Sequence, residues 1–397
     1  MSARQGKGGD GRGTLVLTAG GTGGHVFPAQ ALAQELVRRG HRVALVTDVR
    51  GADYGERFPG VDQYRVRAGT FAGRGMLGKV RALGDIAAGT AAAYRLLGRI
   101  DARAVVGFGG YPSLPTMLAA LARGLPTCLH EQNAVLGRVN RLVAGRVNRV
   151  ALSFDGTTGL SPAASRNAVL TGNPVRAEII EAAHEGYNAP IGDAVFRILV
   201  TGGSQGARIT SEVVPSALAA LPPALARRLQ VTQQCRLADI DRVRDLYERA
   251  GIRADLASFF PDLPDRLAWS HLVIARAGAS TVSEVAVAGR PAILVPLPSA
   301  MDDHQSANAR ALDSAGGGWL VPQDQFTPPE LAKRIQRLAC VPERLVQAAA
   351  AARLVGRPGA AAALADLVET LAGQGANGNG GSHAATGDAA TGRQEAA

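Results

Sequence analysis

The sequence predicts an α/β protein made of two similar halves, each with a mostly parallel β-sheet covered by helices on both faces. Short apolar runs alternate with helical stretches along the chain, a pattern typical of βαβ units. A buried strand, a glycine-rich loop and a helix follow one another near the start of the chain and again near its middle. Two such halves place a ligand-binding cleft at the carboxyl ends of two sheets.

The first half begins with an apolar run at residues 14–19 (TLVLTA), which is expected to be a buried strand. The loop GGTGGH follows at residues 20–25, and Pro28 then opens a helix that ends near Gly40, because proline favours the first turn of a helix and glycine its end. The later strands are expected at residues 42–47, 104–106, 127–130 and 149–152.

The second half repeats the start of the first. A strand expected at residues 197–201 (RILVT) leads into the loop GGSQGAR at residues 202–208 and then into a helix. Further strands are expected at residues 230–233, 271–275 and 292–295. This internal repeat of roughly domain length predicts two domains of the same kind.

Composition restricts the function classes. The 397-residue chain is 46% hydrophobic with a formal net charge of +10, so we expect a soluble globular protein with anionic partners. Only 4% of the residues are aromatic, which weighs against a nucleic-acid stacking platform. The three cysteines lack metal-ligand spacing and favour a reducing compartment. No signal peptide or membrane span is expected, and residues 1–13 and 373–397 are expected to be disordered.

Both glycine-rich loops suit the binding of phosphate groups, because backbone N–H groups and a helix N-terminus bind anions there. Neither loop has the GxxxxGK[ST] pattern, and Val26 stands where a dinucleotide-binding loop starting at Gly21 needs glycine. Asp48 lies where a nicotinamide dehydrogenase has its ribose-binding acid, so a dehydrogenase remains an alternative. A non-catalytic sugar-nucleotide-binding regulator is a third interpretation.

Seven segments, taken in order, resemble one family of enzymes. They are GGTGGHVFPA at residues 20–29, GFGGYPS at 107–113, HEQNAVLGRVN at 130–140, TGNPVR at 171–176, GGSQGAR at 202–208, RAGASTVSEVAVAG at 276–289 and DDHQSANA at 302–309. Over about residues 13–356 the chain resembles the bacterial peptidoglycan glycosyltransferases that add N-acetylglucosamine (GlcNAc) to a lipid-linked muramyl-pentapeptide, forming lipid II. The resemblance implies the GT-B fold, in which two Rossmann-like domains with parallel sheets face a central cleft.

The resemblance also implies a reaction and its partners. An inverting hexosyltransferase moves GlcNAc from UDP-GlcNAc to the C4 hydroxyl of N-acetylmuramic acid (MurNAc) in undecaprenyl-pyrophosphoryl-MurNAc-pentapeptide (lipid I). The implied partners are UDP-GlcNAc, the lipid-linked MurNAc-pentapeptide, an anionic membrane surface and other cell-wall synthesis proteins. No nucleic acid, cofactor or protein-bound catalytic metal is expected. The expected location is peripheral, on the cytoplasmic face of the inner (plasma) membrane.

The same resemblance divides the chain by substrate. Residues 14–176 are expected to bind the acceptor and the membrane, and residues 177–356 to bind UDP-GlcNAc. A C-terminal helix at residues 357–372 can pack back on the first domain. Residues 65–103 contain many arginines, few acids and interleaved apolar residues, which suits an anionic membrane. From the sequence alone an ordinary amphipathic helix is the simpler interpretation, whereas the lipid-linked acceptor favours the membrane.

Inversion in one displacement requires a base for the acceptor hydroxyl, and the catalytic candidates are His25 and Glu131. His25 ends the first glycine loop at the start of a helix, and imidazole accepts a proton near neutral pH. His25 can instead only shape the loop. His130 and Glu131, at the end of another strand, compete for the role of base.

The donor-binding candidates lie mainly in the second half. They are Thr22, Gly23, Gly24, Asn133, Arg176, Ser204, Phe260, Arg276, Ala279, Glu284, Gln305 and Asn308. Ser280 is expected to be a helix N-cap, so that Glu284 lies in the opening turns and accepts hydrogen bonds from a ribose diol. The alternative is a carboxylate favoured only by the helix dipole.

By resemblance, Ser204 is expected to meet the donor diphosphate, and Arg176 and Arg276 to neutralise its charge, although Arg176 can instead form a hinge salt bridge. The remaining expected contacts are the Phe260 backbone with uracil, and Asn133, Gln305 and Asn308 with the sugar; His304 has no assigned contact.

The acceptor-binding candidates form glycine-rich turns of the first half. They are Gly20, Gly21, Gly109, Gly110, Tyr111 and Ser113. A glycine-rich turn ahead of a helix suits the acceptor diphosphate, and the alternative is a plain strand–helix turn. Asp302, Asp303 and His304 are consecutive, so we do not expect them to converge on one metal ion.

Overall fold

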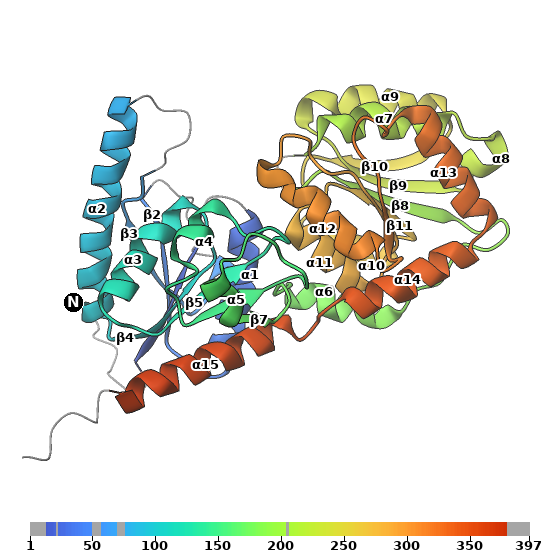
Figure 1. The fold of residues 1–397 in the computed structure, drawn as a ribbon. Helices are drawn as coiled ribbons and strands as arrows, with labels where there is room; N and C mark the ends of the chain where they lie inside the picture. The colour runs from blue at the N-terminus through green and yellow to red at the C-terminus, as the bar shows by residue number, and fades with distance from the viewer. Residues whose placement is uncertain (1–12, 21–22, 50–56, 70–75, 204–205, 379–397) are drawn as a thin grey trace, which may run out of the picture.

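The computed structural model describes residues 13–20, 23–49, 57–69, 76–203 and 206–378. It contains two all-parallel sheets, which confirm the predicted fold class (Figure 1). The first sheet has seven strands in the order β3-β2-β1-β4-β5-β6-β7. The second has six strands in the order β10-β9-β8-β11-β12-β13. We call the two sheets with their covering helices the first and second domains.

The strands of the first sheet are β1 (Thr14–Thr18), β2 (Val43–Asp48), β3 (Asp62–Val66), β4 (Ala102–Gly107), β5 (Thr127–Glu131), β6 (Arg149–Leu152) and β7 (Ala168–Leu170). Those of the second are β8 (Phe196–Thr201), β9 (Leu229–Gln234), β10 (Arg253–Ala257), β11 (Leu272–Ala275), β12 (Ala292–Leu294) and β13 (Gly318–Leu320). Every strand expected from an apolar run is present. The strands that the sequence did not predict are β3, β7, β10 and β13, the outer strands of the two sheets. Outer strands are partly exposed: β3 (DQYRV) and β10 (RADLA) are largely polar, and β7 (AVL) and β13 (GWL) are only 3 residues long.

Helices cover both faces of each sheet. The helices of the first domain are α1 (Gly23–Arg38), α2 (Met76–Arg99), α3 (Leu114–Ala122), α4 (Arg138–Val143) and α5 (Pro162–Arg166), with the short helix η2 (Tyr111–Ser113). Those of the second are α6 (Ala177–Ala182), α7 (Arg208–Ala219), α8 (Pro223–Ala226), α9 (Ile240–Arg249), α10 (Leu263–Trp269), α11 (Ala279–Ala288), α12 (His304–Asp313), α13 (Pro328–Cys340) and α14 (Glu343–Val355), with the short helices η3 (Ala183–Glu185), η4 (Leu237–Asp239) and η5 (Met301–Asp303).

Two helix starts differ from the prediction and change the site. Helix α1 begins at Gly23 rather than at Pro28, so His25 lies within its first turn. Pro28 remains inside the helix, where it removes the one backbone hydrogen bond that an N–H at this position would donate to Gly24 O. Helix α11 has Gly278 rather than Ser280 as its N-cap. Gly278 has the extended backbone typical of an N-cap. A residue can adopt this backbone even when it has no side chain to accept a hydrogen bond from the helix.

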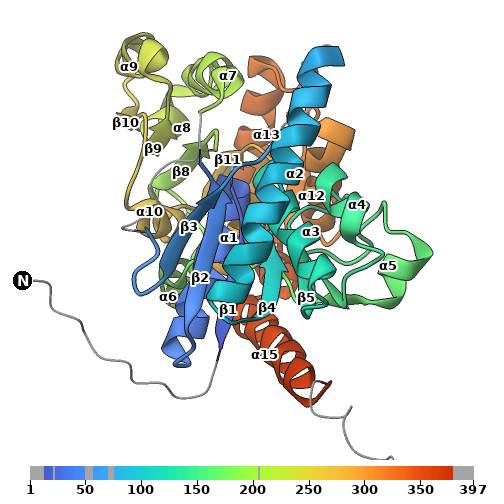
Figure 2. The same ribbon diagram turned by 90° about the vertical axis from the view of Figure 1, so that its left-hand side faces the viewer.

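Helix α15 (Ala360–Gly378) returns to the first domain after α14 has crossed the second (Figures 1 and 2). Its Leu364 and Val368 are fully buried in the core formed by α1 and the first sheet. Arg39 of α1 donates to Asp366 at 2.6 Å and to Glu369 at 2.7 Å. The helix runs beyond residue 372, where the sequence suggested a disordered tail, because a packed helix adds further turns at little entropic cost.

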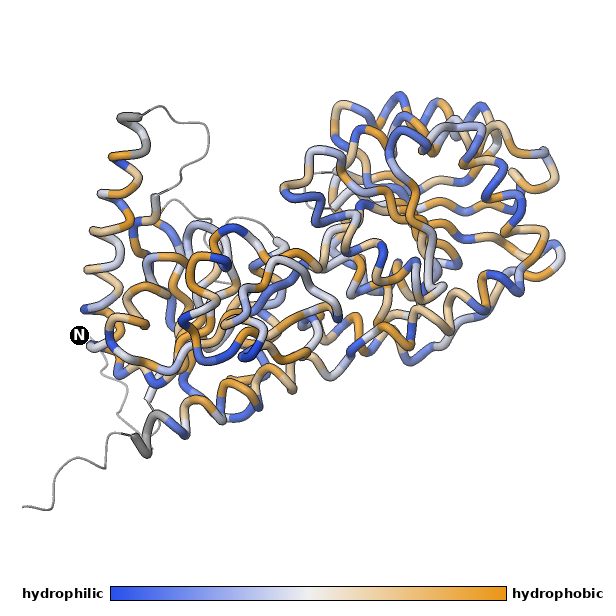
Figure 3. The backbone as a smooth tube through the Cα atoms, viewed as in Figure 1, coloured by the Kyte–Doolittle hydropathy of each residue, from blue (hydrophilic) through white to orange (hydrophobic). Residues whose placement is uncertain are grey.

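Helix α2 packs on α3 along the outer side of the first domain (Figure 1). Its own Ala82, Ile86 and Ala93 are buried, whereas its Val80 and Leu83 are 62% and 59% exposed. Figure 3 accordingly colours α2 as a mixture of hydrophobic and hydrophilic segments. Among the described helices, none combines the length and apolarity that crossing a membrane requires.

Candidate active site

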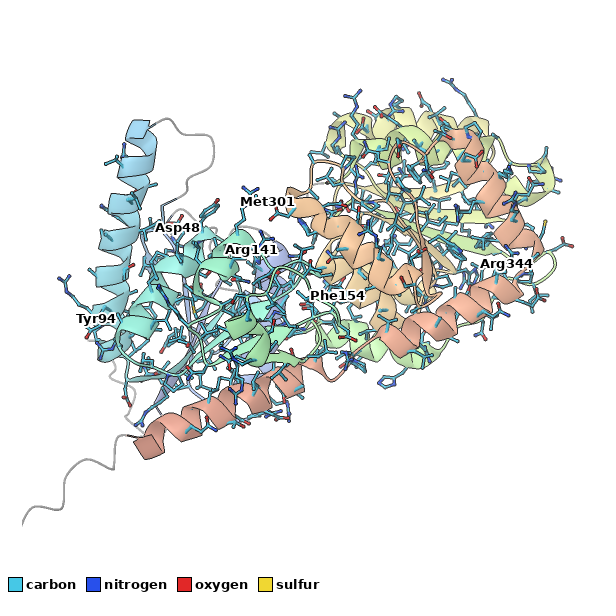
Figure 4. The ribbon with its side chains drawn as sticks, viewed as in Figure 1. Asp48, Tyr94, Arg141, Phe154, Met301 and Arg344 are labelled. Atoms are coloured by element: carbon cyan, nitrogen blue, oxygen red, sulfur yellow. The ribbon has the colours of Figure 1, made fainter. Side chains whose placement is uncertain are left out.

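A cleft of about 1590 Å³ separates the two domains. The start of α1, the turn before η2 and the segment after β5 line one side, and the loop after β8, the start of α11 and the loop before α12 line the other. The loops after β1 and β8 lie where the strand order of each sheet reverses, the usual binding position of open α/β sheets. Figure 4 shows Arg141 and Met301 on facing edges of the two domains.

Most predicted site residues line this cleft. They are Gly23, Gly24, His25, Gly109, Gly110, Tyr111, Glu131, Asn133, Arg176, Phe260, Arg276, Ala279, Glu284 and Gln305. Gly20, Ser113 and Asn308 are buried beside it instead; the Ser113 hydroxyl donates to Gly110 O at 2.9 Å and so holds the turn. The predicted residues Gly21, Thr22 and Ser204 lie outside the described residues.

His25 faces the cleft from the first turn of α1. Its Nδ1 lies 2.8 Å from Gln132 Oε1, at the end of β5. A Cβ atom added to Gly110 would lie 3.4 Å from the His25 ring, so the positive φ of 76° at Gly110 suits a residue without a side chain. The two predicted motifs are therefore adjacent, and the imidazole lies beside the turn before η2.

The Glu131 carboxylate is buried and organises the segment that follows it. Its Oε1 accepts from the backbone N–H of Asn133 at 3.0 Å and its Oε2 from Gly137 N–H at 2.8 Å. The side chains of Asn133 and Asn140 donate to the same two oxygens at 3.2 and 2.7 Å. Four donors thus occupy this carboxylate, an arrangement that favours a positioning role over a proton-accepting one.

Arg176 and Glu284 form an ion pair at the floor of the cleft. Arg176 Nε and Nη2 lie 3.2 and 3.1 Å from Glu284 Oε1. Burial raises the pKa of the Glu284 carboxyl, and Arg176 opposes that rise. The Arg176 guanidinium also lies 5.3 Å from the centre of the Phe27 ring of α1. A contact of this kind links the two domains through a cation–π interaction.

Arg276 is held by groups of its own domain. Its Nη1 donates to the carbonyls of Val295 and Pro296 at 3.1 and 2.9 Å, and its Nη2 donates to Gln323 Oε1 at 2.6 Å. Burial lowers the pKa of this guanidinium. Arg276 therefore fixes the loop after β12, and its positive charge lies at the cleft wall.

Asn308 joins the two domains. Its Oδ1 accepts from Ala134 N–H at 2.8 Å, and its Nδ2 donates to Asn133 Oδ1 and to Ala277 O, both at 3.1 Å. The side chain is fully buried. Its neighbour Gln305 accepts from Leu297 N–H at 3.0 Å. The DDHQSANA motif thus holds the site together as well as lining it.

A second link between the domains involves strained backbone. The Asp302 carboxylate forms ion pairs with Arg138 at 3.4 Å and with Arg141 at 3.0 Å, both from α4. Asp302 and Asp303 have φ angles of 54° and 49°, a left-handed conformation that costs free energy in a residue with a Cβ. His304 Nδ1 lies 2.7 Å from Met301 O. These contacts give Asp302 a partner other than a metal.

Sequence reasoning missed several residues that the structure places at the site. Gln132 lies within the HEQNAVLGRVN segment, between two predicted candidates. Arg138 and Arg141 follow in the same region, three positions apart, so that they share one face of α4. Phe27 lies within the GGTGGHVFPA segment, whereas Gln323 lies outside all seven segments. The partners of both come from distant parts of the chain.

Comparisons with known proteins agree with this architecture. Residues 15–152 match the glycosyltransferase family 28 N-terminal domain, and residues 197–371 match the glycosyltransferase family 28 C-terminal domain. The crystal structure of Acinetobacter baumannii MurG superposes with a TM-score of 0.73 at 31% identity, covering 90% of this chain and 99% of that one. The kitacinnamycin glycotransferase, at 16% identity and a TM-score of 0.67, shares the fold.

Two curated relatives carry the same name, UDP-N-acetylglucosamine–N-acetylmuramyl-(pentapeptide) pyrophosphoryl-undecaprenol N-acetylglucosamine transferase. The protein of Rhodospirillum rubrum is 55% identical over 90% of this chain and 92% of its own length. That of Paramagnetospirillum magneticum is 54% identical over 90% of this chain and 96% of its own. These matches decide against the dehydrogenase suggested by Asp48. The chain is a member of glycosyltransferase family 28 with the GT-B fold, and belongs to its N-acetylglucosamine transferases of this name.

Proposed function

We propose that this enzyme transfers GlcNAc from UDP-GlcNAc to the C4 hydroxyl of MurNAc in lipid I, forming lipid II for peptidoglycan synthesis. One observation supports this reaction above the others. A single cleft brings the His25 imidazole of the first domain opposite the Arg176–Glu284 pair of the second. A base and a nucleotide site on opposite walls are what a direct transfer between two bound substrates needs.

The proposed chemistry is one in-line displacement with inversion. The C4 oxygen of MurNAc attacks C1 of GlcNAc, and its proton passes to His25 Nε2. The bond between C1 and the diphosphate oxygen breaks, and UDP leaves with the electron pair. Positive groups and backbone N–H donors around the diphosphate stabilise the charge that develops on it.

The donor roles are assigned to residues 177–356 and to Arg176 beside them. Glu284 accepts hydrogen bonds from the ribose diol through Oε2, since Oε1 faces Arg176. The loop after β8, with Ser204, holds the diphosphate, and the positive φ of 80° at Gly203 opens the backbone towards it. Arg176 and Arg276 supply positive charge. Phe260, Ala279 and Gln305 contact the nucleotide or its sugar, with Gly23, Gly24 and Asn133 on the opposite wall and Asn308 holding Asn133 in place. Thr22, which lies outside the described residues, is also assigned to the donor.

The acceptor roles are assigned to residues 14–176. Gly109 and Gly110, both with positive φ, leave space beside His25 for the acceptor diphosphate, and Tyr111 lines the same wall. Gly20 and Ser113 shape these turns, and Gly21, which lies outside the described residues, is assigned to the acceptor with them. We assign Glu131 to positioning, because its carboxylate is fully engaged by the segment that follows it.

The reaction is tested with the full chain, UDP-GlcNAc and a lipid I analogue, with UDP-glucose and NADH as control substrates. We expect a product enlarged by one GlcNAc. Replacing His25 with alanine should lower kcat by about 10²- to 10⁴-fold, the usual contribution of a general base. His184→Ala, at an exposed histidine of the second domain, is the matched control and should retain turnover. Near-normal turnover of the His25 variant would limit His25 to a structural role.

We further propose that the first domain binds the cytoplasmic face of the membrane through α2. Exposed Val80 and Leu83 flank the exposed Arg81, a combination of apolar and basic groups that suits an anionic lipid surface. Other cell-wall synthesis proteins are the further partners expected at that surface.

Vesicle sedimentation tests the membrane proposal. The variant Val80→Ser/Arg81→Glu/Leu83→Ser should lose binding to anionic vesicles, since each basic group near such a surface contributes about 1 kcal/mol. Arg337→Glu, at an exposed position of α13 in the second domain, controls for net charge and should still bind. Sedimentation of the triple variant at native levels at moderate salt would place the membrane surface elsewhere.

A further inference from the structure

A continuous hydrogen-bonded chain runs from His25 into the core of the first domain. His25 Nδ1 lies 2.8 Å from Gln132 Oε1, and Gln132 Nε2 lies 3.0 Å from His130 Nδ1. His130 Nε2 in turn lies 3.1 Å from the backbone oxygen of Gly172. His130 is fully buried and Gln132 is 1% exposed. The chain is therefore shielded from water except at the His25 end.

The position of each hydrogen in this hydrogen-bonded chain follows from two backbone carbonyl groups, Gly172 O and His130 O. A carbonyl oxygen can only accept, so His130 Nε2 carries a hydrogen that it donates to Gly172 O. Burial lowers the pKa of His130 to about 4, so the ring is neutral and its Nδ1 accepts. Gln132 Nε2 also lies 3.0 Å from the carbonyl oxygen of His130, which fixes that end of the amide as the NH₂ group.

The orientation of Gln132 then determines the form of His25. With its NH₂ group on His130, the amide presents Oε1, an acceptor, to His25. His25 Nδ1 must therefore carry the hydrogen, and in the neutral ring the lone pair lies on Nε2. Within the described part of the chain, Nε2 has no hydrogen-bond partner. The ring of Phe108, 5.4 Å from that of His130, packs against the inner end of the chain.

We infer that Gln132 and His130 are positioning residues that hold His25 as the Nδ1–H tautomer, with the Nε2 lone pair available to the acceptor hydroxyl. This inference rests on the proposed function for its catalytic meaning. The tautomer itself is a property of the free protein and is measurable without substrate. Gln132 is the central element, because the His130 carbonyl keeps its amide oriented even when the His130 ring is removed.

The first measurement is the ¹⁵N spectrum of the histidine rings at a pH where they are neutral. The full protein has seven histidines, and the signals that are missing from the spectrum of His25→Ala identify His25. We expect a protonated Nδ1 and an unprotonated Nε2 in the native protein. In Gln132→Leu we expect a mixture of the two tautomers. A native His25 that carries its hydrogen on Nε2, or a Leu variant with an unchanged tautomer, would overturn the inference.

The second measurement is turnover. Gln132→Leu should lower kcat by about 10-fold, the effect of losing one hydrogen bond in the transition state, while KM for UDP-GlcNAc stays within about 2-fold. His130→Phe, which removes the inner ring but leaves the His130 carbonyl to orient the Gln132 amide, should lose less kcat than Gln132→Leu. Native UDP affinity in both variants shows that they fold. Equal kcat losses in Gln132→Leu and His130→Phe would refute the central positioning role of Gln132.

The two measurements separate this inference from the function on which it rests. The inferred tautomer in a native protein that transfers no GlcNAc would support the hydrogen-bond assignment and refute the proposed reaction. Normal GlcNAc transfer by a native protein with the other tautomer would refute the hydrogen-bond assignment and support the proposed reaction.

Discussion

Removing the Glu284 carboxylate should weaken UDP binding without unfolding the protein. The Glu284 side chain is 11% exposed, and its Oε1 is taken by Arg176, which leaves Oε2 for the ribose. Hydrogen bonds to a charged acceptor contribute about 1.5–3 kcal/mol. Once released from Glu284, Arg176 can turn towards the diphosphate. This new contact offsets part of the binding free energy that is lost with a second hydrogen bond to the ribose. We therefore expect Glu284→Ala to raise the Kd of UDP by about 10- to 150-fold.

Isothermal titration calorimetry with the full chain measures this change. Glu248→Ala, at an exposed glutamate of α9 in the same domain, removes an equal charge and should leave the Kd unchanged. Glu284→Gln keeps the shape and should give an intermediate loss. The double variant with Arg176→Ala gives the coupling between the two residues. Native UDP affinity in Glu284→Ala would refute the ribose assignment.

The same site should respond to pH. Burial raises the pKa of Glu284, so the carboxylate gains a proton at a higher pH than an ordinary glutamate. A protonated carboxyl accepts hydrogen bonds less well, and UDP affinity should therefore fall as the pH is lowered through that raised pKa. The difference between the native protein and Glu284→Gln isolates this effect from the titration of UDP itself. Parallel pH profiles for the two proteins would contradict the reasoning.

Three further predictions concern stability, measured as the free energy of unfolding in urea. Asn308→Leu should lower it by about 2–4 kcal/mol, because three hydrogen bonds at the domain boundary are lost; Gln336→Leu, at an exposed position, is the control, and equal stabilities would contradict the interdomain role. Leu364→Ala should cost about 2–5 kcal/mol, since this residue of α15 is fully buried, whereas Leu354→Ala, at an 89% exposed position of α14, should cost little; matching losses would mean that α15 does not pack on the first domain in solution. Burial lowers the pKa values of His130 and His271 to about 4, so the unfolded chain binds protons more tightly, and the free energy of unfolding should fall as the pH decreases from about 6.5 to about 4. In His271→Phe the free energy of unfolding should depend less steeply on pH. An unchanged pH dependence would exclude His271 as a source of it.

The sequence alone predicted the inner architecture of both domains. Buried strands of a parallel sheet are apolar on both faces, so β1, β2 and β8 appear as continuous apolar runs. Loops that bind phosphates need glycine where the backbone approaches the ligand, so both glycine loops were visible without a structure. The outer strands β3 and β10 were not, because their partly exposed residues are polar.

Only the tertiary structure decided which side chains meet. His25 and Gln132 are 107 positions apart in the sequence, and Arg176 and Glu284 are 108 apart. The sequence identified three of these four residues as candidates and left Arg176 between a diphosphate contact and a hinge salt bridge. A hydrogen bond forms only within a few tenths of an ångström of its preferred length. Such distances are set when whole strands and helices pack into two domains and the domains face each other, which local patterns of residue type do not determine.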